Sequence, residues 1–160
     1  VRHPDCPPPP DGRYPDIAIG LLDSDVPTNI ISFAKVLPDD YAMILGTGQR
    51  LPCLRLDQEE KALIGDVGTI ASSGRNTTAT MPIWPDRMQF YEDVITGDSG
   101  NPMFIILDGQ PVLLTLWTMG VEGSGTSTTM FKEDINALMR QLDDAYQLTP
   151  IDLSQFINAQ

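Results

Sequence analysis

The sequence predicts an all-β domain that ends in an α-helix, and three features of the chain indicate this. Two apolar runs, residues 103–107 and 111–117, flank an Asp-Gly pair, which is typical of a β-hairpin. Residues 49–56 predict a further strand, and residues 57–80 predict strands joined by exposed turns. From Lys132 onwards, apolar side chains recur instead at the spacing of a helix.

The composition indicates one globular domain and argues against two classes of partner. The chain has 160 residues, of which 41% are hydrophobic and 20% are charged, so it is long enough to bury a core. The formal net charge of -12 repels phosphate backbones and argues against nucleic-acid binding. No apolar run approaches the ~20 residues that cross a bilayer, so we expect no membrane partner. An acidic surface favours binding to basic proteins or peptides, although a high net charge more often serves only to keep a protein soluble.

Residues 1–15 contain six prolines, four of them consecutive, and favour an extended polyproline loop. The only histidine, His3, lies here, as does Cys6. Cys6 and Cys53 are the only cysteines, and the sequence leaves open whether they form a disulfide. One histidine and two cysteines without zinc spacing imply no metal site, and no motif implies a cofactor. The chain starts at Val1 rather than Met, so we expect an upstream segment.

The next segment, residues 16–22, is an apolar run that begins with an acid, Asp16. It predicts a buried strand, and Asp16 on its own would be a turn residue ahead of that strand. Residues 26–48 predict a connection, with a short helix or strand at 41–45. The spacing of five apolar residues places them on one face of the predicted C-terminal helix: Ile135, Leu138, Met139, Leu142 and Tyr146. Residues 149–152 predict the cap and start of a short extra helix.

The stretch with the most chemical information is residues 96–102, Thr-Gly-Asp-Ser-Gly-Asn-Pro. A serine hydroxyl is a poor nucleophile unless a base takes its proton and N–H donors hold the oxyanion. Glycines on both sides allow a tight turn in which the N–H groups of Gly97 and Ser99 point at one oxyanion. The alternative interpretation is a surface turn between two strands, because a short motif is a hypothesis until its context supports it.

This stretch resembles the nucleophile motif of the trypsin-like (chymotrypsin-fold) serine peptidases, Gly-Asp-Ser-Gly-Gly-Pro. The match covers residues 97–100 and Pro102, and Asn101 replaces a glycine, which is a mild change because Asn tolerates left-handed backbone. The family carries its catalytic aspartate in an Asp-Ile-Ala segment followed by aliphatic residues, and Asp16 begins such a segment here. The order of the two motifs and their separation of 83 residues also suit the family. The resemblance covers roughly residues 14–145.

The resemblance implies a chymotrypsin-like antiparallel β-barrel, made of the second barrel plus part of the first, with a C-terminal α-helix. Residues 1–45 would be a remnant of the first barrel and the inter-barrel connection. Residues 46–147 would be the second barrel with its helix, and residues 148–160 a short helical tail. Cys53 falls where many members have a disulfide cysteine, but isoleucines at 105–106 occupy the usual place of its partner, so that disulfide is expected to be absent.

The resemblance also implies a mechanism. Ser99 would attack a peptide carbonyl, a histidine oriented by Asp16 would take its proton, and the N–H groups of Gly97 and Ser99 would hold the oxyanion. In the family the acid before the serine, here Asp98, pairs with an amino terminus made by zymogen cleavage, and its partner in this chain stays open. His3 lacks the family's Ala-His-Cys context, so we expect the upstream segment of the protein to supply the histidine. A catalytic His3 and a degenerate enzyme are the alternatives.

Four residues are implied to bind substrate: Asp93, Thr96, Trp117 and Thr118. The residue six before the serine lines the base of the family's primary specificity pocket, and here it is Asp93, which would select Lys or Arg. Ile95 replaces the cysteine that fixes this loop, and Thr118 replaces the glycine that keeps the pocket open, which favours small side chains instead. Without the resemblance, Asp93 would be a solvated loop acid.

The sequence therefore predicts a trypsin-like serine endopeptidase that hydrolyses protein or peptide substrates and is incomplete in this chain. The alternative is a catalytically inactive, protease-like β-barrel that binds proteins. A further alternative is an unrelated β-protein in which Asp16 and Ser99 lie far apart. The resemblance favours a secreted or periplasmic location.

Overall fold

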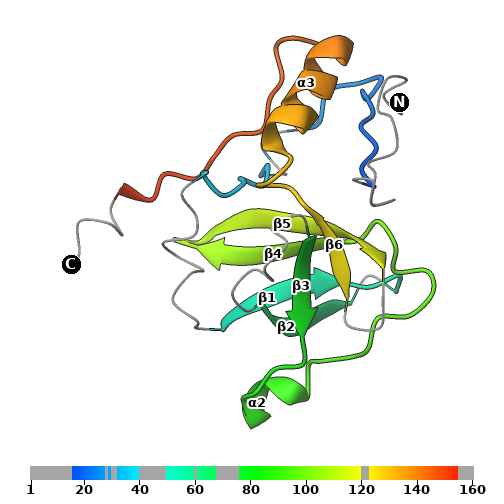
Figure 1. Ribbon diagram of the computed structural model, residues 1–160, viewed down its shortest axis with the longest axis vertical. Coiled ribbons are helices and arrows are strands. Elements are labelled where there is room, and N and C mark those ends of the chain that lie inside the picture. Colours follow the sequence, from blue (N-terminus) through cyan, green and yellow to red (C-terminus); the bar gives the residue numbers. More distant parts are fainter. Residues whose placement is uncertain are drawn as a thin grey trace, which may run out of the picture.

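The computed structural model describes residues 16–154 except 28, 30–31, 40–49, 60, 68–75 and 120–122. At its centre is a closed antiparallel barrel with the strand order β1-β2-β3-β6-β5-β4 (Figure 1). Its elements are β1 (Leu51–Leu56), β2 (Ala62–Val67), β3 (Asn76–Thr80), α2 (Pro85–Met88), β4 (Pro102–Leu107), β5 (Gln110–Met119), β6 (Ser124–Ser127) and α3 (Lys132–Leu142). The predicted mostly β architecture is confirmed. Neither helix of this described part has the length and apolarity needed to cross a membrane.

The predicted hairpin is formed by β4 and β5. Leu107 pairs with Gln110, and the two residues between them, Asp108 and Gly109, have φ angles of 50° and 71°. Two successive positive φ values match the type I′ turn that joins twisted antiparallel strands, which is why Asp-Gly marks this position. The strands predicted at 49–56 and within 57–80 correspond to β1, β2 and β3.

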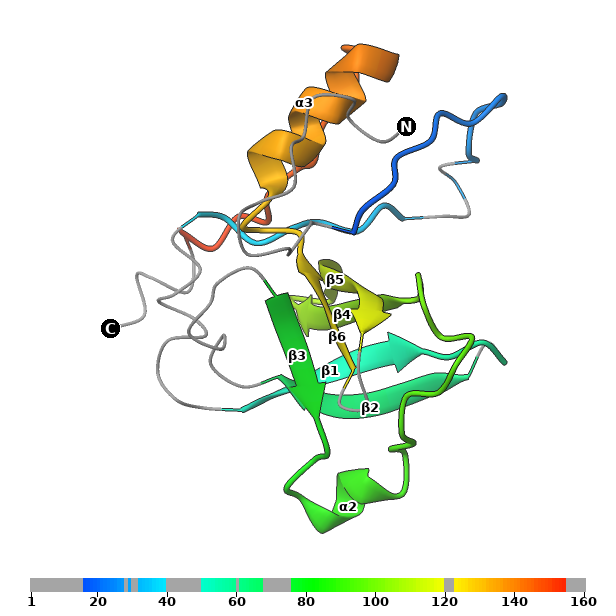
Figure 2. The same cartoon turned by 45° about the vertical axis from the view of Figure 1, so that its right-hand side comes forward.

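The helices lie on opposite sides of the barrel. In both views α3 and the segments 16–27 and 32–39 lie above the strands, whereas α2 projects below them (Figures 1 and 2). Lys132, at the start of α3, places its Nζ 2.6 Å from Asp39 Oδ1. The α2 segment is tied to β2 through Asp66, which accepts a hydrogen bond from the Ile83 N–H (3.2 Å).

The buried strand expected at residues 16–22 is wrong. This segment has no regular secondary structure, and Leu21 and Leu22 are 58% and 66% exposed. A strand needs a neighbour for its N–H and C=O groups, and none of the named strands pairs with this segment in the part of the chain that is described. The possible helix or strand at 41–45 lies outside the described residues.

The helix start expected at residues 149–152 lies later in the chain: Ser154 is helical, whereas residues 149–152 are not. The Val36 N–H donates to the Thr149 carbonyl (3.1 Å), and the Ile151 N–H donates to the Val36 carbonyl (2.9 Å). Val36 and Pro150 form an isolated parallel bridge, so the backbone here is extended and bonded to a distant segment. These long-range bonds satisfy the groups that a helical turn would otherwise use.

The core fills the barrel and continues under residues 149–153. Its members are apolar and at most 6% exposed: Leu37, Cys53, Val67, Ala79, Met103, Ile105, Val112, Leu114, Trp117, Ile151 and Leu153. Burying a large apolar side chain contributes about 1.5–3 kcal/mol. Because β4 and β5 supply five of these side chains, the loop that enters β4 is attached to the best-packed part of the fold.

Cys53 is a free thiol at the centre of β1, and burial raises its pKa to about 12. The unfolded thiol ionises from its ordinary pKa of 9.0, so unfolding releases a proton between these two values. The free energy of unfolding should therefore fall with rising pH in this window, by up to about 1.4 kcal/mol per unit from this group.

The measurement is urea denaturation at pH 8 and pH 10 of a Cys6→Ser chain, with and without Cys53→Ala. The chain that keeps Cys53 should lose more stability on the shift to pH 10. An equal loss in both chains, or fast reaction of the native Cys53 thiol with a disulfide reagent, would contradict the buried neutral thiol.

Candidate active site

Residues 95–101 form two successive turns directly before β4. The Asp98 N–H donates to the Ile95 carbonyl (3.2 Å), and the Asn101 N–H donates to the Asp98 carbonyl (3.0 Å). Gly97 and Gly100 have φ angles of 113° and 92°, which L side chains rarely adopt and glycine adopts freely. The two glycines of the motif are thus required by the backbone, and the serine between them is exposed.

This Ser99 loop (residues 95–101) is fixed to β5 at one point. The Gly100 N–H donates to the Trp117 carbonyl (2.8 Å), and the Trp117 N–H donates to the Asn101 carbonyl (3.0 Å). Trp117 is 2% exposed. Its ring packs so closely on Gly123 that a Cβ there would lie 2.1 Å from Trp117 Cζ3. The loop is therefore held by a residue that is itself locked in the core.

Asp98 is the buried anchor of the loop, only 4% exposed. Its Oδ2 accepts the Ile95 N–H (2.9 Å), and its Oδ1 accepts the N–H of Gln58 in the turn between β1 and β2 (3.0 Å). The sequence left the partner of Asp98 open, and the structure assigns two backbone donors to it. One comes from the same loop and one from a turn 40 residues away in the chain.

The N–H groups of Gly97 and Ser99 are available beside the serine hydroxyl. Among the residues that the structure describes, none accepts a hydrogen bond from either group. The neighbouring N–H groups of Asp98 and Gly100 are both engaged, with Ile95 and Trp117. An oxyanion site requires such unengaged backbone donors beside a hydroxyl, and also that they point at one position.

Asp16 lies beside β6. Its N–H donates to Thr126 Oγ1 (3.1 Å), and Thr126 pairs with Leu116 across β5 and β6. The Ser99 loop bonds to the next residue of β5, Trp117. Asp16 and the Ser99 loop are therefore attached to neighbouring positions of the β5–β6 pair. Asp16 bonds at the Leu116–Thr126 pair, and the loop bonds to Trp117. His3, the alternative source of the catalytic imidazole, lies outside the described residues.

The four residues expected to bind substrate occupy different environments. Asp93 and Thr96 are exposed, Thr118 is half-buried and Trp117 is buried. Asp93 and Asp98 line a cavity of about 70 Å³ between the β1–β2 turn and residues 92–98, which carries five carboxylates in all. Such a lining favours a cationic group.

Lys61 lies close to two of the acids that line this small cavity. Lys61 forms ion pairs with Glu59 (2.8 Å) and Glu92 (3.7 Å). The hydrogen bond to Glu59, with the charges of both acids, raises the pKa of Lys61. Lys61 therefore partly neutralises Glu59 and Glu92, two of the five carboxylates. In the described structure it forms no ion pair with Asp93 or Asp98.

Sequence reasoning missed Arg55, which is 2% exposed inside the barrel. Its guanidinium lies 4.9 Å from the ring centre of Tyr91 and 5.4 Å from that of Trp117, and it donates to the Glu92 carbonyl. Nε and Nη1 have no hydrogen-bond partner in the described structure. The sequence carried no signal for this, because its alternation would place Leu54 and Leu56 in the core, whereas they are 37% and 38% exposed. Gln58, which binds Asp98, carried no signal either.

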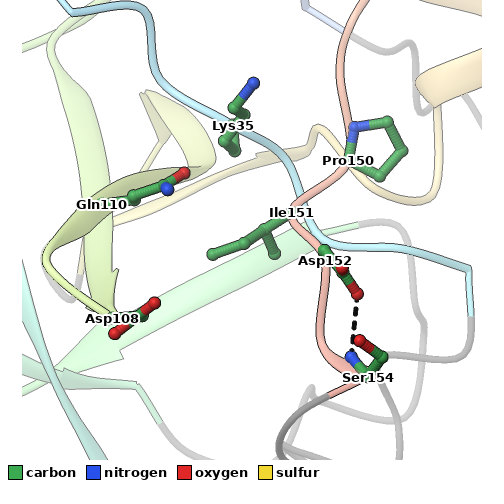
Figure 3. Close-up of a pocket in the computed structure, with 7 residues that line it drawn as sticks. All are labelled: Lys35, Asp108, Gln110, Pro150, Ile151, Asp152 and Ser154. Carbon is green, nitrogen blue, oxygen red and sulfur yellow. Dashed lines mark hydrogen bonds between the residues drawn. The ribbon is translucent and has the colours of Figure 1, made fainter.

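A larger cavity of about 370 Å³ lies at the other end of β4 from Ser99. It opens between the β4–β5 turn, with Asp108 and Gln110, and residues 150–154 (Figure 3). Asp152 accepts a hydrogen bond from the Ser154 N–H (2.9 Å), and the hydrogen bonds from Ser154 lower the pKa of Asp152. Neither this cavity nor the smaller one is lined by Ser99 or Asp16.

Comparison of the chain with protein-family models, with curated proteins and with solved structures gave no significant match. The functional interpretation therefore depends on the residues themselves.

Proposed function

We propose that this chain carries the nucleophile of a chymotrypsin-like serine endopeptidase, with its barrel as the second of two. The observation that supports this most directly is the Ser99 loop, in which the serine is exposed and the N–H groups of Gly97 and Ser99 bond to no residue of the described structure. The buried carboxylate of Asp98 anchors this loop through two backbone N–H groups.

In the proposed reaction, Ser99 Oγ attacks the carbonyl carbon of a peptide bond while a histidine takes the hydroxyl proton. The carbonyl oxygen becomes an oxyanion and accepts hydrogen bonds from the N–H groups of Gly97 and Ser99. The histidine then passes the proton to the leaving amine, and water releases the acyl group by the same route. Asp16 orients the imidazole, which is contributed by a segment outside residues 16–154.

We further propose that the substrate carries a basic side chain next to the cleaved bond. The support for this is electrostatic. Asp93 lines a small cavity with four other carboxylates, and a chain of net charge -12 attracts cations over a longer range.

The test is labelling with a fluorophosphonate probe, which reacts only with activated serines. The probe is applied to this chain, to the full-length protein, and to the Ser99→Ala variant of each. We expect the full-length protein to be labelled and its Ser99→Ala variant to stay unlabelled.

The pattern of labelling separates the alternatives. Labelling of this chain itself, lost in Ser99→Ala, would mean that His3 or another group in it acts as the base. A folded full-length protein that stays unlabelled would overturn the peptidase proposal and leave the protein-binding barrel.

A further inference from the structure

The turn between β1 and β2 is stiffened by its own first residue. Asp57 Oδ1 accepts the N–H groups of Glu59 (2.9 Å) and Lys61 (2.8 Å), and the Asp57 N–H donates to the Lys61 carbonyl (3.2 Å). A side chain that binds the backbone ahead of it closes a turn without help from the core. Gln58 is therefore presented from a fixed position.

Gln58 contacts two consecutive residues of the Ser99 loop. Its N–H donates to Asp98 Oδ1 (3.0 Å). Its side-chain amide covers the face of Gly97 on which a side chain would stand, because a Cβ built there would lie 1.8 Å from Gln58 Oε1 and 2.9 Å from Cδ. Leaving out the chain neighbours of Gly97, the three atoms nearest to this point all belong to Gln58.

This contact matters because glycine does not fix its own conformation. Glycine populates positive and negative φ about equally, so the φ of 113° at Gly97 must be held by its surroundings. The direction of the Gly97 N–H depends on that backbone conformation. The side chain nearest to the open face of Gly97 in the described structure is that of Gln58.

We propose that Gln58 is a positioning residue for Ser99: its side chain holds Gly97 in the conformation that directs the Gly97 N–H to the oxyanion. This inference rests on the proposed function, since it assigns the Gly97 N–H to the oxyanion site. Gln58 itself touches no reacting atom. It acts through Gly97, and the β1–β2 turn thereby becomes part of the active-site architecture.

The experiment compares Gln58→Ala and Gln58→Met in the full-length protein, with Gln141→Ala, the same change at an exposed position of α3, as the control. Both Gln58 variants keep the backbone N–H that binds Asp98, so the side chain alone is tested. Removing one oxyanion donor costs about 10²–10³ in rate, and a displaced donor should cost less. We expect Gln58→Ala to lower the rate of fluorophosphonate labelling about 10- to 100-fold.

With a peptide substrate, kcat should fall while KM stays unchanged, because the oxyanion forms only in the reaction. Gln58→Met, of the same length, should retain most of the rate, and Gln141→Ala should match the wild type.

A second readout, the ¹H–¹⁵N amide shift of Gly97 in this chain, does not require activity. We expect Gln58→Ala to move it and Gln141→Ala to leave it in place. If the wild type is labelled and Gln58→Ala is labelled equally fast, the inference is overturned and the peptidase proposal stands. If the wild type is not labelled, the peptidase proposal falls. The Gly97 shift then decides the positioning: a change confined to Gln58→Ala supports it, and no change overturns it.

Discussion

Replacing Gly97 by alanine should reduce the labelling rate of Ser99 by at least about 100-fold while leaving the barrel folded. Two effects combine at this position. A φ of 113° is strained for any L side chain and costs about 1–3 kcal/mol. The new methyl group would also lie 1.8 Å from Gln58 Oε1. Since Gln58 has a flexible side chain, it can swing away, but Gly97 then loses the contact that holds its N–H, and a misplacement of about 1 Å can cost 10²-fold in rate.

Gly100→Ala is the matched control for this prediction. Gly100 has a φ of 92°, and no atom lies within 4 Å of a Cβ built on it. It therefore shares the backbone strain without the contact to Gln58. Both variants should lose similar stability in urea denaturation, whereas only Gly97→Ala should lose most of the labelling. Equal losses of labelling would show that backbone strain alone governs the loop.

Replacing Asp98 by asparagine should lower the free energy of unfolding by about 2–4 kcal/mol. The carboxylate is 4% exposed and uses one oxygen for the Ile95 N–H and the other for the Gln58 N–H. An amide of the same shape offers one oxygen and directs its NH₂ group at the second donor. One charge-assisted hydrogen bond is lost, at about 1.5–3 kcal/mol, and the other becomes a neutral hydrogen bond that is about 1 kcal/mol weaker. The change also releases the β1–β2 turn from the Ser99 loop, so labelling of Ser99 should fall.

Asp93→Asn serves as the control because it makes the same chemical change five residues away. Asp93 is exposed, and surface changes of this kind alter stability by no more than about 0.5 kcal/mol. The measurement is urea denaturation of both variants beside the wild type. An Asp98→Asn chain as stable as Asp93→Asn would mean that the two N–H groups find acceptors elsewhere, which would contradict the role of Asp98 as an anchor.

Local features of the chain could be predicted because their causes lie within a few residues. The Asp108-Gly109 turn follows from the backbone angles that a two-residue hairpin requires. The turns around Ser99 follow in the same way from the glycines at 97 and 100. Glycine is favoured at these two positions because the turns require positive φ angles there. It was therefore predictable that the Ser99 hydroxyl would lie close to backbone N–H donors. The reactivity of Ser99 stays a prediction.

Segments whose conformation depends on distant partners could not be predicted in the same way. Residues 16–22 have the apolar pattern of a buried strand, yet none of the barrel strands in the described structure pairs with them. Residues 149–152 have the pattern of a helix start, yet their backbone bonds to Val36. In both cases the pattern describes the chemistry of the segment, whereas the conformation follows from which neighbour supplies the hydrogen bonds.

The sequence by itself determined the mostly β class, the β4–β5 hairpin and the turn that exposes Ser99, because propensity and turn chemistry act locally. Only the tertiary structure decided what surrounds that serine. Closure of the barrel brings Gln58 to Asp98 across 40 residues and Asp16 to Thr126 across 110, and it buries Trp117 and Arg55. Contacts over such separations depend on how strands pair and twist into a barrel, and no pattern within a short stretch of sequence carries that information.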